Sequence, residues 1–405
     1  MLIDKSTVLE IAREHGTPYY LTKGEKLKNQ YNMLIRCFPD HTRVAYATKA
    51  NYSESVIEIF RDLDTSFDVF SPGELNHLLD CNCDPEKFIY TSVSETEKEF
   101  DLAIRKGVKT FVLGSMKGIE RFVKTAEESG TVDDLDILLR TQPLKKVAAR
   151  VSTSGKHSKF GFVFEEAKDS VDNALNKLKE KGLQLSGLHC HLGSQIKNPE
   201  TYVEAIRKML SFAVEEIPNI KKLDIGGGFP ARYHENVPEI STVGAKIEKE
   251  MKYWRKKLGD IELILEPGRF LTSMAGILVS KIVNVKHMYG RKILILNVSE
   301  DMVEVERHGK IATPSVITEK EELVETSIAG NLCHSNDWIS REPQMLPDAE
   351  SGDIIVFENL GAYQINHNIP YNLRPLPKIL TMIDGKVIEN NHPFTLITNF
   401  VFGKA

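Results

Sequence analysis

The feature that most constrains the fold of this chain is a regular alternation of short apolar runs with longer amphipathic runs. The apolar runs that we expect to form strands are Arg43–Thr48, Phe67–Phe70, Phe88–Tyr90, Thr110–Leu113, Asp136–Arg140, Leu185–Cys190, Lys222–Ile225 and Ile261–Leu265. Helical spacing of apolar residues predicts helices between them, at Ser53–Arg61, Pro72–Leu79, Glu95–Arg105, Lys117–Glu127, Phe164–Lys181, Pro199–Val214 and Val243–Lys257. Such alternation implies a parallel sheet. An open, doubly wound sheet would alternate in the same way, but eight strands favour a closed (β/α)8 TIM barrel in the α/β class.

The pattern changes after about Phe270. Here β-rich runs follow one another with few helical patterns between them, at Ile277–Val285, Lys292–Val298, Ile311–Ile317 and Ile354–Phe357. A turn at Tyr289-Gly290 joins the first two runs. We therefore expect a C-terminal β-rich domain of the β-barrel or β-sandwich kind, completed by a strand near Tyr19. The predicted division is a barrel at residues 24–275 and a β domain formed by residues 1–23 and 276–405.

Composition excludes several classes of function. The 405 residues are 41% hydrophobic, which suffices for two domains. A net charge of -5 and a pI near 6.2 provide no basic field for nucleic acid. No apolar run has the length of a membrane span, and Met1–Lys5 is too polar for a signal peptide. The five cysteines are odd in number and lack paired spacing, which predicts reduced thiols in a cytoplasmic protein.

Lys49 stands where the first predicted barrel strand ends. Burial of an ammonium group is costly, so a structural lysine normally keeps its charge in water while its stem packs against the protein. A lysine at the mouth of a buried strand could instead serve as an amine that forms a Schiff base. Taken alone, Lys49 fits an ordinary strand-end lysine better. The residues that follow the later strands decide between the two interpretations.

The ends of the last three predicted barrel strands carry further unusual residues. His189 and His191 end the sixth strand, Gly226–Gly228 follow the seventh, and Glu266 and Arg269 follow the eighth. Active sites of TIM barrels form at these carboxyl ends, and phosphate usually binds after strands seven and eight. The bare amides of a glycine run could hold a phosphate, although such a run could also be a flexible turn. The two histidines could be zinc ligands, but no third ligand is evident, and the ring of His191 could equally lie flat on a planar cofactor.

Together these groups match the needs of pyridoxal 5'-phosphate. The cofactor requires an amine for its aldehyde, a cradle with an arginine for its phosphate, and a carboxylate for its ring nitrogen. The carboxylate keeps the pyridine nitrogen protonated, so that the ring accepts the electrons released when a bond to Cα breaks. Lys49, Gly226–Gly228, Arg269 and Glu266 are the candidates for these tasks.

The chain resembles the alanine-racemase-like (fold type III) pyridoxal phosphate decarboxylases, the group of diaminopimelate, ornithine and arginine decarboxylases. The resemblance runs from Tyr19 to Pro377. It rests on motifs that occur in the family's order: Ala47–Asn51, His191–Ser194, Gly226–Pro230, Glu266–Arg269 and Gly361–Tyr363. Jointly these motifs are very specific.

The resemblance implies a role for each matching residue. Lys49 would be the Schiff-base lysine, His191 would stack on the ring, and Glu266 would bind the pyridine nitrogen. The implied cofactor-binding set is Lys49, Asp68, His191, Ser194, Gly227, Gly228, Glu266, Gly268, Arg269 and Tyr363, and the implied catalytic set is Lys49, His191, Glu266 and Cys333. Asp68 and Glu74 match a stretch near the ring, and Lys159 is interpreted as a structural partner of an acid there.

Cys333 lies in Leu332–Asp337, where the family places a cysteine that enters the partner subunit's site and returns a proton to Cα. The resemblance therefore implies a homodimer with shared active sites. Diaminopimelate decarboxylases carry a glutamate after this cysteine and ornithine decarboxylases an aspartate, whereas this chain has His334. The family's Arg-Pro-x-x-Tyr segment is also missing, and Arg307 lies in its vicinity. Both departures count against diaminopimelate. The predicted substrate-binding residues are Arg307, His334, Asp337 and Tyr363.

We predict a decarboxylase that acts on a polar α-amino acid or an amino-acid conjugate, without a metal. A racemase on the same scaffold is the first alternative, but racemases of this fold usually place an arginine against the pyridine nitrogen, and Glu266 argues against that. A non-catalytic pyridoxal phosphate carrier is the second alternative. Carriers of this fold lack the second domain, whereas about 130 residues follow the barrel here, on the order of one small domain.

Overall fold

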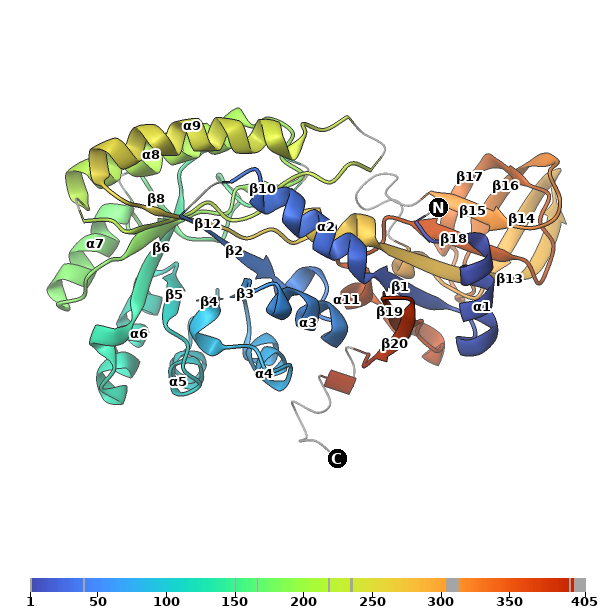
Figure 1. The fold of residues 1–405 in the computed structure, drawn as a ribbon, viewed down its shortest axis with the longest axis horizontal. Helices are drawn as coiled ribbons and strands as arrows, with labels where there is room; N and C mark the ends of the chain where they lie inside the picture. The colour runs from blue at the N-terminus through green and yellow to red at the C-terminus, as the bar shows by residue number, and fades with distance from the viewer. Residues whose placement is uncertain are drawn as a thin grey trace.

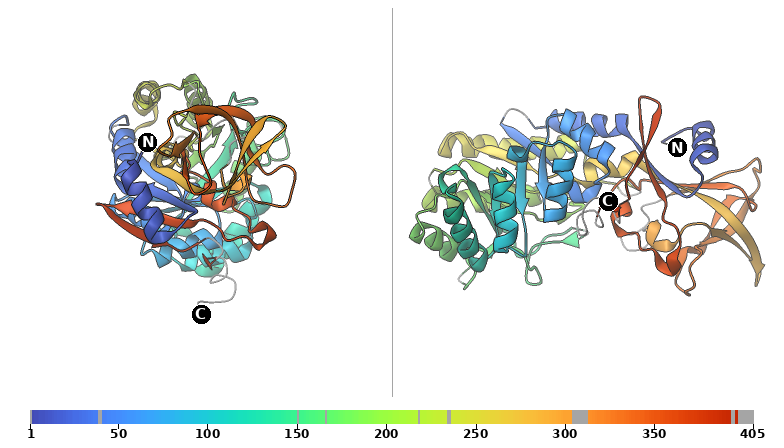
Figure 2. Two further views of the ribbon diagram at one scale, coloured as in Figure 1. Left: turned by 90° about the vertical axis from the view of Figure 1, so that its right-hand side faces the viewer. Right: turned by 90° about the horizontal axis from the view of Figure 1, so that it is seen from below.

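The computed structural model describes residues 2–38, 41–149, 151–165, 167–217, 219–233, 236–303, 313–392 and 395–396. The barrel and the β domain lie side by side along the longest axis of the molecule (Figures 1 and 2). No helix within these ranges is both long enough and apolar enough to cross a membrane. The cytoplasmic location stays a prediction.

Eight parallel strands close into a barrel. They are β2 (Thr42–Ala47), β3 (Ser66–Val69), β4 (Phe88–Thr91), β5 (Thr110–Leu113), β6 (Asp136–Gln142), β9 (Gly187–His189), β11 (Lys222–Asp224) and β12 (Glu262–Leu265). Their order is β5-β4-β3-β2-β12-β11-β9-β6, and the pairing of β5 with β6 closes the ring. The predicted (β/α)8 TIM barrel is therefore confirmed, and the open-sheet alternative is wrong.

Helices cover the outside of the barrel. They are α2 (Gly24–Ile35), α3 (Glu54–Asp62), α4 (Pro72–Asp80), α5 (Glu97–Arg105), α6 (Met116–Ser129), α7 (Val171–Glu180), α8 (Glu200–Glu216) and α9 (Ile240–Leu258). The short, buried α10 (Arg269–Thr272) follows β12. Local signals fix their ends. For example, Ser71 caps α4 by accepting a hydrogen bond from the Glu74 amide at 3.2 Å, and Pro72 occupies the first turn. Three two-residue strands lie in the loops: β7 (Val151–Ser152), β8 (Phe162–Val163) and β10 (Gly193–Ser194).

The β domain is a nine-stranded mixed sheet. Its strands are β1 (Tyr19–Lys23), β13 (Gly276–Met288), β14 (Arg291–Leu296), β15 (Pro314–Ile317), β16 (Leu323–Ala329), β17 (Trp338–Pro347), β18 (Ile354–Glu358), β19 (Lys378–Ile383) and β20 (Lys386–Asn390). The β-rich prediction is confirmed, and so is the strand near Tyr19, because β1 pairs with both β13 and β19. The division at residues 24 and 275 stays a prediction.

The two faces of this sheet bury different clusters. Successive strand residues point to opposite faces, so Tyr20 joins Leu278 and Leu294 on one side, whereas Tyr19 and Leu21 face the other. Helix α1 (Lys5–His15) covers that second face with Val8 and Ile11. Tyr363, which precedes the short helix α11 (Gln364–His367), contacts the barrel by donating its amide to the Ala50 carbonyl.

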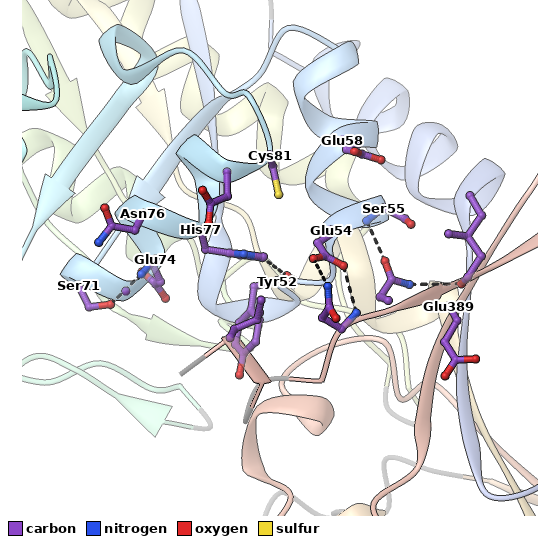
Figure 3. A pocket seen from close by; sticks show the side chains of 16 residues that line it. Tyr52, Glu54, Ser55, Glu58, Ser71, Glu74, Asn76, His77, Cys81 and Glu389 are labelled. Carbon is purple, nitrogen blue, oxygen red and sulfur yellow. Dashed lines mark hydrogen bonds between the residues drawn. The ribbon is translucent and has the colours of Figure 1, made fainter. Parts of the chain in front are cut away.

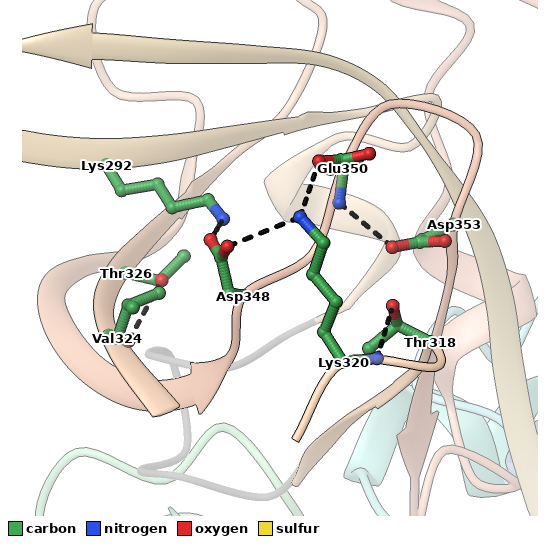
Figure 4. Close-up of polar contacts among 8 residues, drawn as sticks. All are labelled: Lys292, Thr318, Lys320, Val324, Thr326, Asp348, Glu350 and Asp353. Atoms are coloured by element: carbon green, nitrogen blue, oxygen red, sulfur yellow. Dashed lines mark hydrogen bonds and ion pairs between the residues drawn. The ribbon is translucent and has the colours of Figure 1, made fainter. Parts of the chain in front are cut away.

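Ion pairs tie two loops of the β domain together at its outer end (Figure 4). Lys292, which is almost buried, donates to Asp348. Lys320 lies 3.4 Å from the same carboxylate and also donates to Glu350. These contacts join the residues that follow β15 to the residues that follow β17.

Candidate active site

The strand register determines which side chains enter the barrel. Ala45, Ile89, Val112, Leu138 and Ile264 form a buried cluster of their own inside the ring. In-register partners on parallel strands share a face, and so do residues two apart on one strand. The residues two positions beyond this layer, toward the carboxyl ends, therefore also point inward. That upper ring contains Ala47, Asp68, Thr91, Arg140, His189, Asp224 and Glu266.

Lys49 lies directly above this ring, in the single 3₁₀ turn Thr48–Ala50 that follows β2. Its Nζ donates to Asp68 Oδ2. The side chain of Lys49 is 38% exposed, whereas that of Asp68 is only 2% exposed. Burial of the amine opposes its charge, but the carboxylates of Asp68 and Glu266 outweigh this effect, so the pKa of Lys49 is raised above its usual value. The amine is thus held at the open end of the lumen by an acid beneath it.

Three carboxyl groups share the upper ring. Burial and the neighbouring Glu266 raise the pKa of Asp68, and the contact with Lys49 offsets part of that rise. Burial and Glu266 also raise the pKa of Asp224, well above its ordinary value. Burial opposes the charge of Glu266 too, but His189 and Lys49 reverse this effect and lower its pKa. Glu266 is therefore the acid of this ring that is held most firmly in its ionised form.

His191 follows β9 and lies beside Glu266. Its Nδ1 accepts a hydrogen bond from the Gly227 amide at 3.2 Å and lies 3.9 Å from Glu266 Oε2. Burial lowers the pKa of His191 to about 3, so the ring is neutral and carries its proton on Nε2. A neutral imidazole in this position presents a flat ring to the lumen.

The glycine run after β11 passes close to neighbouring backbone. A Cβ on Gly227 would lie 2.2 Å from the Glu266 carbonyl oxygen, and Gly228 adopts a φ of +85°. Arg269 Nε, at the start of α10, donates to Ser194 Oγ at 3.1 Å, and its Nη1 donates to Tyr233 at 2.9 Å. An arginine, a hydroxyl and a close-packed glycine turn therefore meet after strands β11 and β12.

Tyr363 enters this end of the barrel from the β domain. Its ring lies 4.7 Å from the Arg269 guanidinium, and its amide donates to the Ala50 carbonyl at 2.6 Å. Asn366 donates to the Lys49 carbonyl at 2.5 Å. A Cβ on Gly268 would lie 2.9 Å from the Ala50 Cβ and 3.2 Å from the Tyr363 hydroxyl, so glycine lets these residues pack closely. The segment that begins α11 thus holds the lysine turn in place.

Sequence reasoning missed Arg140. Its side chain points into the upper ring from β6, and its guanidinium stacks 4.2 Å from the Phe160 ring and 6.0 Å from the Phe70 ring. Burial lowers the pKa of Arg140, while Glu266 and Asp68 oppose that effect. A charged residue among the last residues of a barrel strand was the available signal. Lys159, which was predicted to pair with an acid, is exposed and lies 5.5 Å from the Phe160 ring.

The other predicted residues belong to a loop of the β domain between β16 and β17. Cys333 is exposed, and its amide donates to Asn372 at 3.0 Å. His334 packs edge-on against Tyr371, with ring centroids 5.8 Å apart. The carboxylate of Asp337 accepts the amides of Glu300 and Leu332, at 2.8 and 2.6 Å, so it braces its own loop. Within the described ranges the structure does not bring these side chains to Lys49. Arg307 lies outside the described residues.

A pocket of about 1050 Å³ opens on the outside of the barrel between α3, α4 and the residues around β20 (Figure 3). Glu74 and His77 from α4 line it, and His77 Nε2 lies 2.7 Å from the Tyr52 carbonyl oxygen. Its lining includes neither Lys49 nor Glu266. The Glu74 carboxylate accepts a hydrogen bond from the Phe70 amide at 2.6 Å, and the charges of Lys49 and Asp68 act on its pKa.

The donor set fits pyridoxal 5'-phosphate. Lys49 offers an amine, Ser194 and Arg269 offer donors beside a glycine turn that a Cβ would obstruct, and Glu266 offers a buried carboxylate. The buried Glu266 carboxylate has His189 Nε2 3.3 Å from Oε1, and it retains the capacity to accept an external N–H. His189, Asp224 and Glu266 could also ligate a metal by distance, since one donor atom of each lies within 4.8 Å of the others.

Comparison with known proteins agrees with this geometry. Residues 24–273 match the family model described as "Pyridoxal-dependent decarboxylase, pyridoxal binding domain". The diaminopimelate decarboxylase of Methanocaldococcus jannaschii is 29% identical over 396 residues, covering 93% of this chain and 89% of that protein. A crystal structure of diaminopimelate decarboxylase from M. jannaschii superposes with a TM-score of 0.87 at 27% identity, covering 98% of this chain and 94% of the other. A second crystal structure, in co-complex with L-lysine, gives a TM-score of 0.84 at 26% identity, covering 94% and 91%.

Proposed function

The chain belongs to the pyridoxal-dependent decarboxylase family, and from this premise we propose that Lys49 holds the cofactor while a polar amino acid or amino-acid conjugate loses its α-carboxylate above the upper ring. Family membership confirms the predicted cofactor, pyridoxal 5'-phosphate, and the predicted enzyme class, an amino-acid decarboxylase of the diaminopimelate and ornithine type. The racemase and carrier alternatives are set aside accordingly. The roles of the individual residues are our proposal.

The observation that carries these roles is the placement of Lys49 above Asp68 and opposite Glu266. When bound, pyridoxal phosphate supplies a protonated ring that accepts the electron pair released as the bond between Cα and the carboxylate breaks. Lys49 would hold the cofactor through its aldehyde carbon. Asp68 keeps the lysine in position. Glu266 would hold the proton of the ring nitrogen, and the neutral ring of His191 would support the ring.

The phosphate group is assigned to the residues after β11 and β12. Arg269 carries the charge, and the Ser194 hydroxyl already lies within hydrogen-bond distance of it. Gly228 and Tyr363 line the same corner. The Gly227 amide donates to His191, so Gly227 contributes by admitting the close approach of backbone. Gly268 contributes by leaving room for Tyr363.

Borohydride trapping tests the assignment of Lys49. Reduction of the holoenzyme should fix the cofactor to Lys49, as mapped by peptide mass spectrometry, and Lys49→Ala should give no adduct and no release of carbon dioxide. Lys222→Ala is the matched control, because Lys222 is a lysine paired with an aspartate at the opposite end of the barrel. It should trap the cofactor like the wild type. An adduct at another lysine would refute the proposal.

We further propose a homodimer in which Cys333 of one subunit completes the site of the other and returns the proton to Cα. The support is an exposed apolar surface beside the cysteine loop. Leu373 is 91% exposed and Ile369 and Tyr371 are exposed, whereas side chains of this kind are normally buried unless they meet a partner. The segment of Tyr371–Leu373 contacts the loop through the hydrogen bond from Cys333 to Asn372.

Subunit complementation tests the shared site. Lys49→Ala and Cys333→Ala should each abolish or strongly reduce turnover, and a refolded mixture of the two should regain activity, because hybrid dimers contain one intact site. If the mixture stays as inactive as its components, the site is not shared in this way. Cys333→Ala should still bind the cofactor, which distinguishes a lost proton donor from a misfolded loop.

The substrate proposal rests on the loop around His334. The Asp337 carboxylate already accepts hydrogen bonds from two backbone amides. We therefore propose that His334 is the side chain of this loop that contacts the substrate. We propose a substrate with a polar or carboxylate-bearing side chain, other than the commonest basic amino acids. A panel that includes diaminopimelate, lysine, ornithine, arginine and carboxylate-bearing conjugates, scored by release of carbon dioxide, tests it. Fastest turnover of diaminopimelate or of a basic amino acid would overturn the proposal.

A further inference from the structure

Three buried side chains meet directly beneath the proposed cofactor position. His189 ends β9, Asp224 ends β11 and Glu266 follows β12, and His189 and Asp224 are in-register partners whose side chains point into the lumen. One donor atom of each lies within 4.8 Å of the others. All three residues are at most 5% exposed. Bulk solvent is therefore excluded from this group.

The hydrogen bonds of this group are incomplete. Both ring nitrogens of His189, Oδ2 of Asp224 and Oε1 of Glu266 are buried and lack a partner among the described residues. His189 Nε2 lies 3.3 Å from Glu266 Oε1, slightly beyond an ideal hydrogen bond. Asp224 Oδ1 accepts the Gly226 amide at 2.8 Å, which leaves Oδ2 as its free oxygen. Buried polar atoms of this kind are costly unless they share protons with one another.

The charges of the upper ring indicate where the proton belongs. The titratable groups that face Glu266 are Lys49, Asp68, Arg140, His189, Cys190, His191 and Asp224. Lys49 is engaged by Asp68, which leaves Arg140 as the remaining cation for two carboxyl groups. Two ionised carboxylates this close in a buried site are unfavourable, so one of them keeps a proton. His189 Nε2 faces Glu266, whereas Asp224 accepts the Gly226 amide on Oδ1, which leaves Oδ2 as the atom that can carry the proton. The pKa directions agree with this placement, because burial raises the pKa of Asp224 and His189 helps to lower that of Glu266.

We propose that His189 and Asp224 are positioning residues that fix the charge of Glu266: His189 donates its Nε2–H to an ionised Glu266, and Asp224 remains a neutral carboxylic acid. The inference rests on the proposed contact of Glu266 with the ring nitrogen. Its consequence is that Glu266 stays available as an anion over the working pH range. His189 and Asp224 thus act on the ring only through Glu266 and do not contact it themselves.

Cofactor affinity as a function of pH tests the role of His189. In His189→Leu, Glu266 loses its donor and its pKa rises, so affinity for pyridoxal phosphate should fall progressively as the pH is lowered from 8 to 6, by about tenfold relative to wild type at the acid end. His189→Gln retains an N–H at the position of Nε2 and should restore affinity to within about threefold of wild type. If the affinity of His189→Leu depends on pH in the same way as that of the wild type, the proposal is wrong.

Infrared spectroscopy of the full-length protein without cofactor tests Asp224. The C=O stretch of a buried protonated carboxyl group should be present at neutral pH, should disappear in Asp224→Asn, and should persist in Asp136→Asn, a matched change at the other end of the barrel. Because Asn resembles a neutral Asp in shape, Asp224→Asn should retain most of the cofactor affinity. A band unaffected by Asp224→Asn, or an affinity as poor as that of Glu266→Gln, would refute a neutral Asp224.

Two further measurements separate the possible failures. If Glu266→Gln binds the cofactor like the wild type, the proposed role of Glu266 itself is wrong. If Glu266→Gln is impaired but His189→Leu is not, only the present inference fails. A stoichiometric metal in the purified protein that is lost in His189→Leu would overturn it in favour of a metal centre.

Discussion

Both ends of the barrel interior carry acidic and basic side chains. Acids and cations are equal in number in the pairs at the amino end, whereas acids are in excess at the carboxyl end. At the amino end, Arg43 pairs with Glu262 at 3.0 Å and Lys222 pairs with Asp136, one cation for each acid, and both pairs are partly exposed. At the carboxyl end, the buried acids of the upper ring outnumber the cations Lys49 and Arg140. The layer of Ile264 and Leu138 separates the two ends.

The pKa directions follow this difference. Burial opposes the charge of Asp136, but Lys222 outweighs that effect and lowers its pKa, so Asp136 is ionised and paired. Burial raises the pKa of Glu74 to about 7 and raises that of Asp224 well above its ordinary value. Ion pairs at the amino end stabilise the fold. The excess of acidic groups at the carboxyl end, with their shifted pKa values, is typical of a site that binds a charged ligand.

The strongest test of this comparison changes the same residue at both ends of one strand. Glu266→Gln should reduce the rate of decarboxylation by about 10²–10³-fold, because a neutral amide no longer holds the proton of the ring nitrogen. Glu262→Gln removes only a partly exposed ion pair, so its rate should equal that of the wild type. Steady-state release of carbon dioxide measures both. Equal losses would mean that the two ends do not differ in function.

The middle layer should affect stability rather than chemistry. Leu138 is fully buried within it, so Leu138→Ala should lower the free energy of unfolding by about 2–5 kcal/mol through lost burial and the cavity left behind. Denaturant unfolding measures this loss. The cofactor affinity of the folded fraction should stay unchanged, and a loss of affinity that exceeds the loss of stability would show that the layer also shapes the site.

Glu74 provides a pH-dependent test. Its pKa in the folded protein, about 7, lies above the ordinary 4.5, so the folded state binds the proton more tightly than the unfolded state. The resulting stabilisation is fully present below about pH 4.5 and is lost as the pH rises through about 7. Wild type should therefore lose stability relative to Glu74→Gln across this interval, by on the order of 1–2 kcal/mol. Unfolding curves at several pH values check this, and parallel curves would contradict the pKa.

The barrel could be predicted from the sequence because its strands and helices follow from local periodicity, and because the carboxyl ends of parallel strands must meet. This brought Lys49, His191, Glu266 and Arg269 together before the structure was known. The predicted helix over Phe164–Lys181 proved too long, since α7 begins only at Val171, after a short strand and a loop. Local apolar spacing does not reveal such interruptions.

Other features could not be predicted because they depend on contacts distant in sequence. The strands β16, β17, β19 and β20 were missed. Much of β17 and β20 is exposed, so neither strand carries the sustained apolar run or alternation that indicates a strand. Asp337 stabilises its loop by accepting hydrogen bonds from the amides of Glu300 and Leu332. No sequence motif predicts these contacts. The inward direction of Arg140 follows only from the register with β9.

The smallest expected effect lies at the amino end. Asp136→Asn removes the ion pair with Lys222 and weakens the contact with Ser186 at 2.9 Å, but Asp136 is partly exposed, so the loss at pH 7 should be at most about 1 kcal/mol. Because the folded pKa of Asp136 is lowered, its contribution is present above the unfolded pKa near 3.8 and is lost as the pH falls through the folded value. Wild type and variant should therefore converge in acid, and added salt should narrow the gap at pH 7. Chemical unfolding at both pH values measures it. A loss of several kcal/mol, or weaker binding of pyridoxal phosphate, would show that Asp136 contributes more than a local ion pair with Lys222.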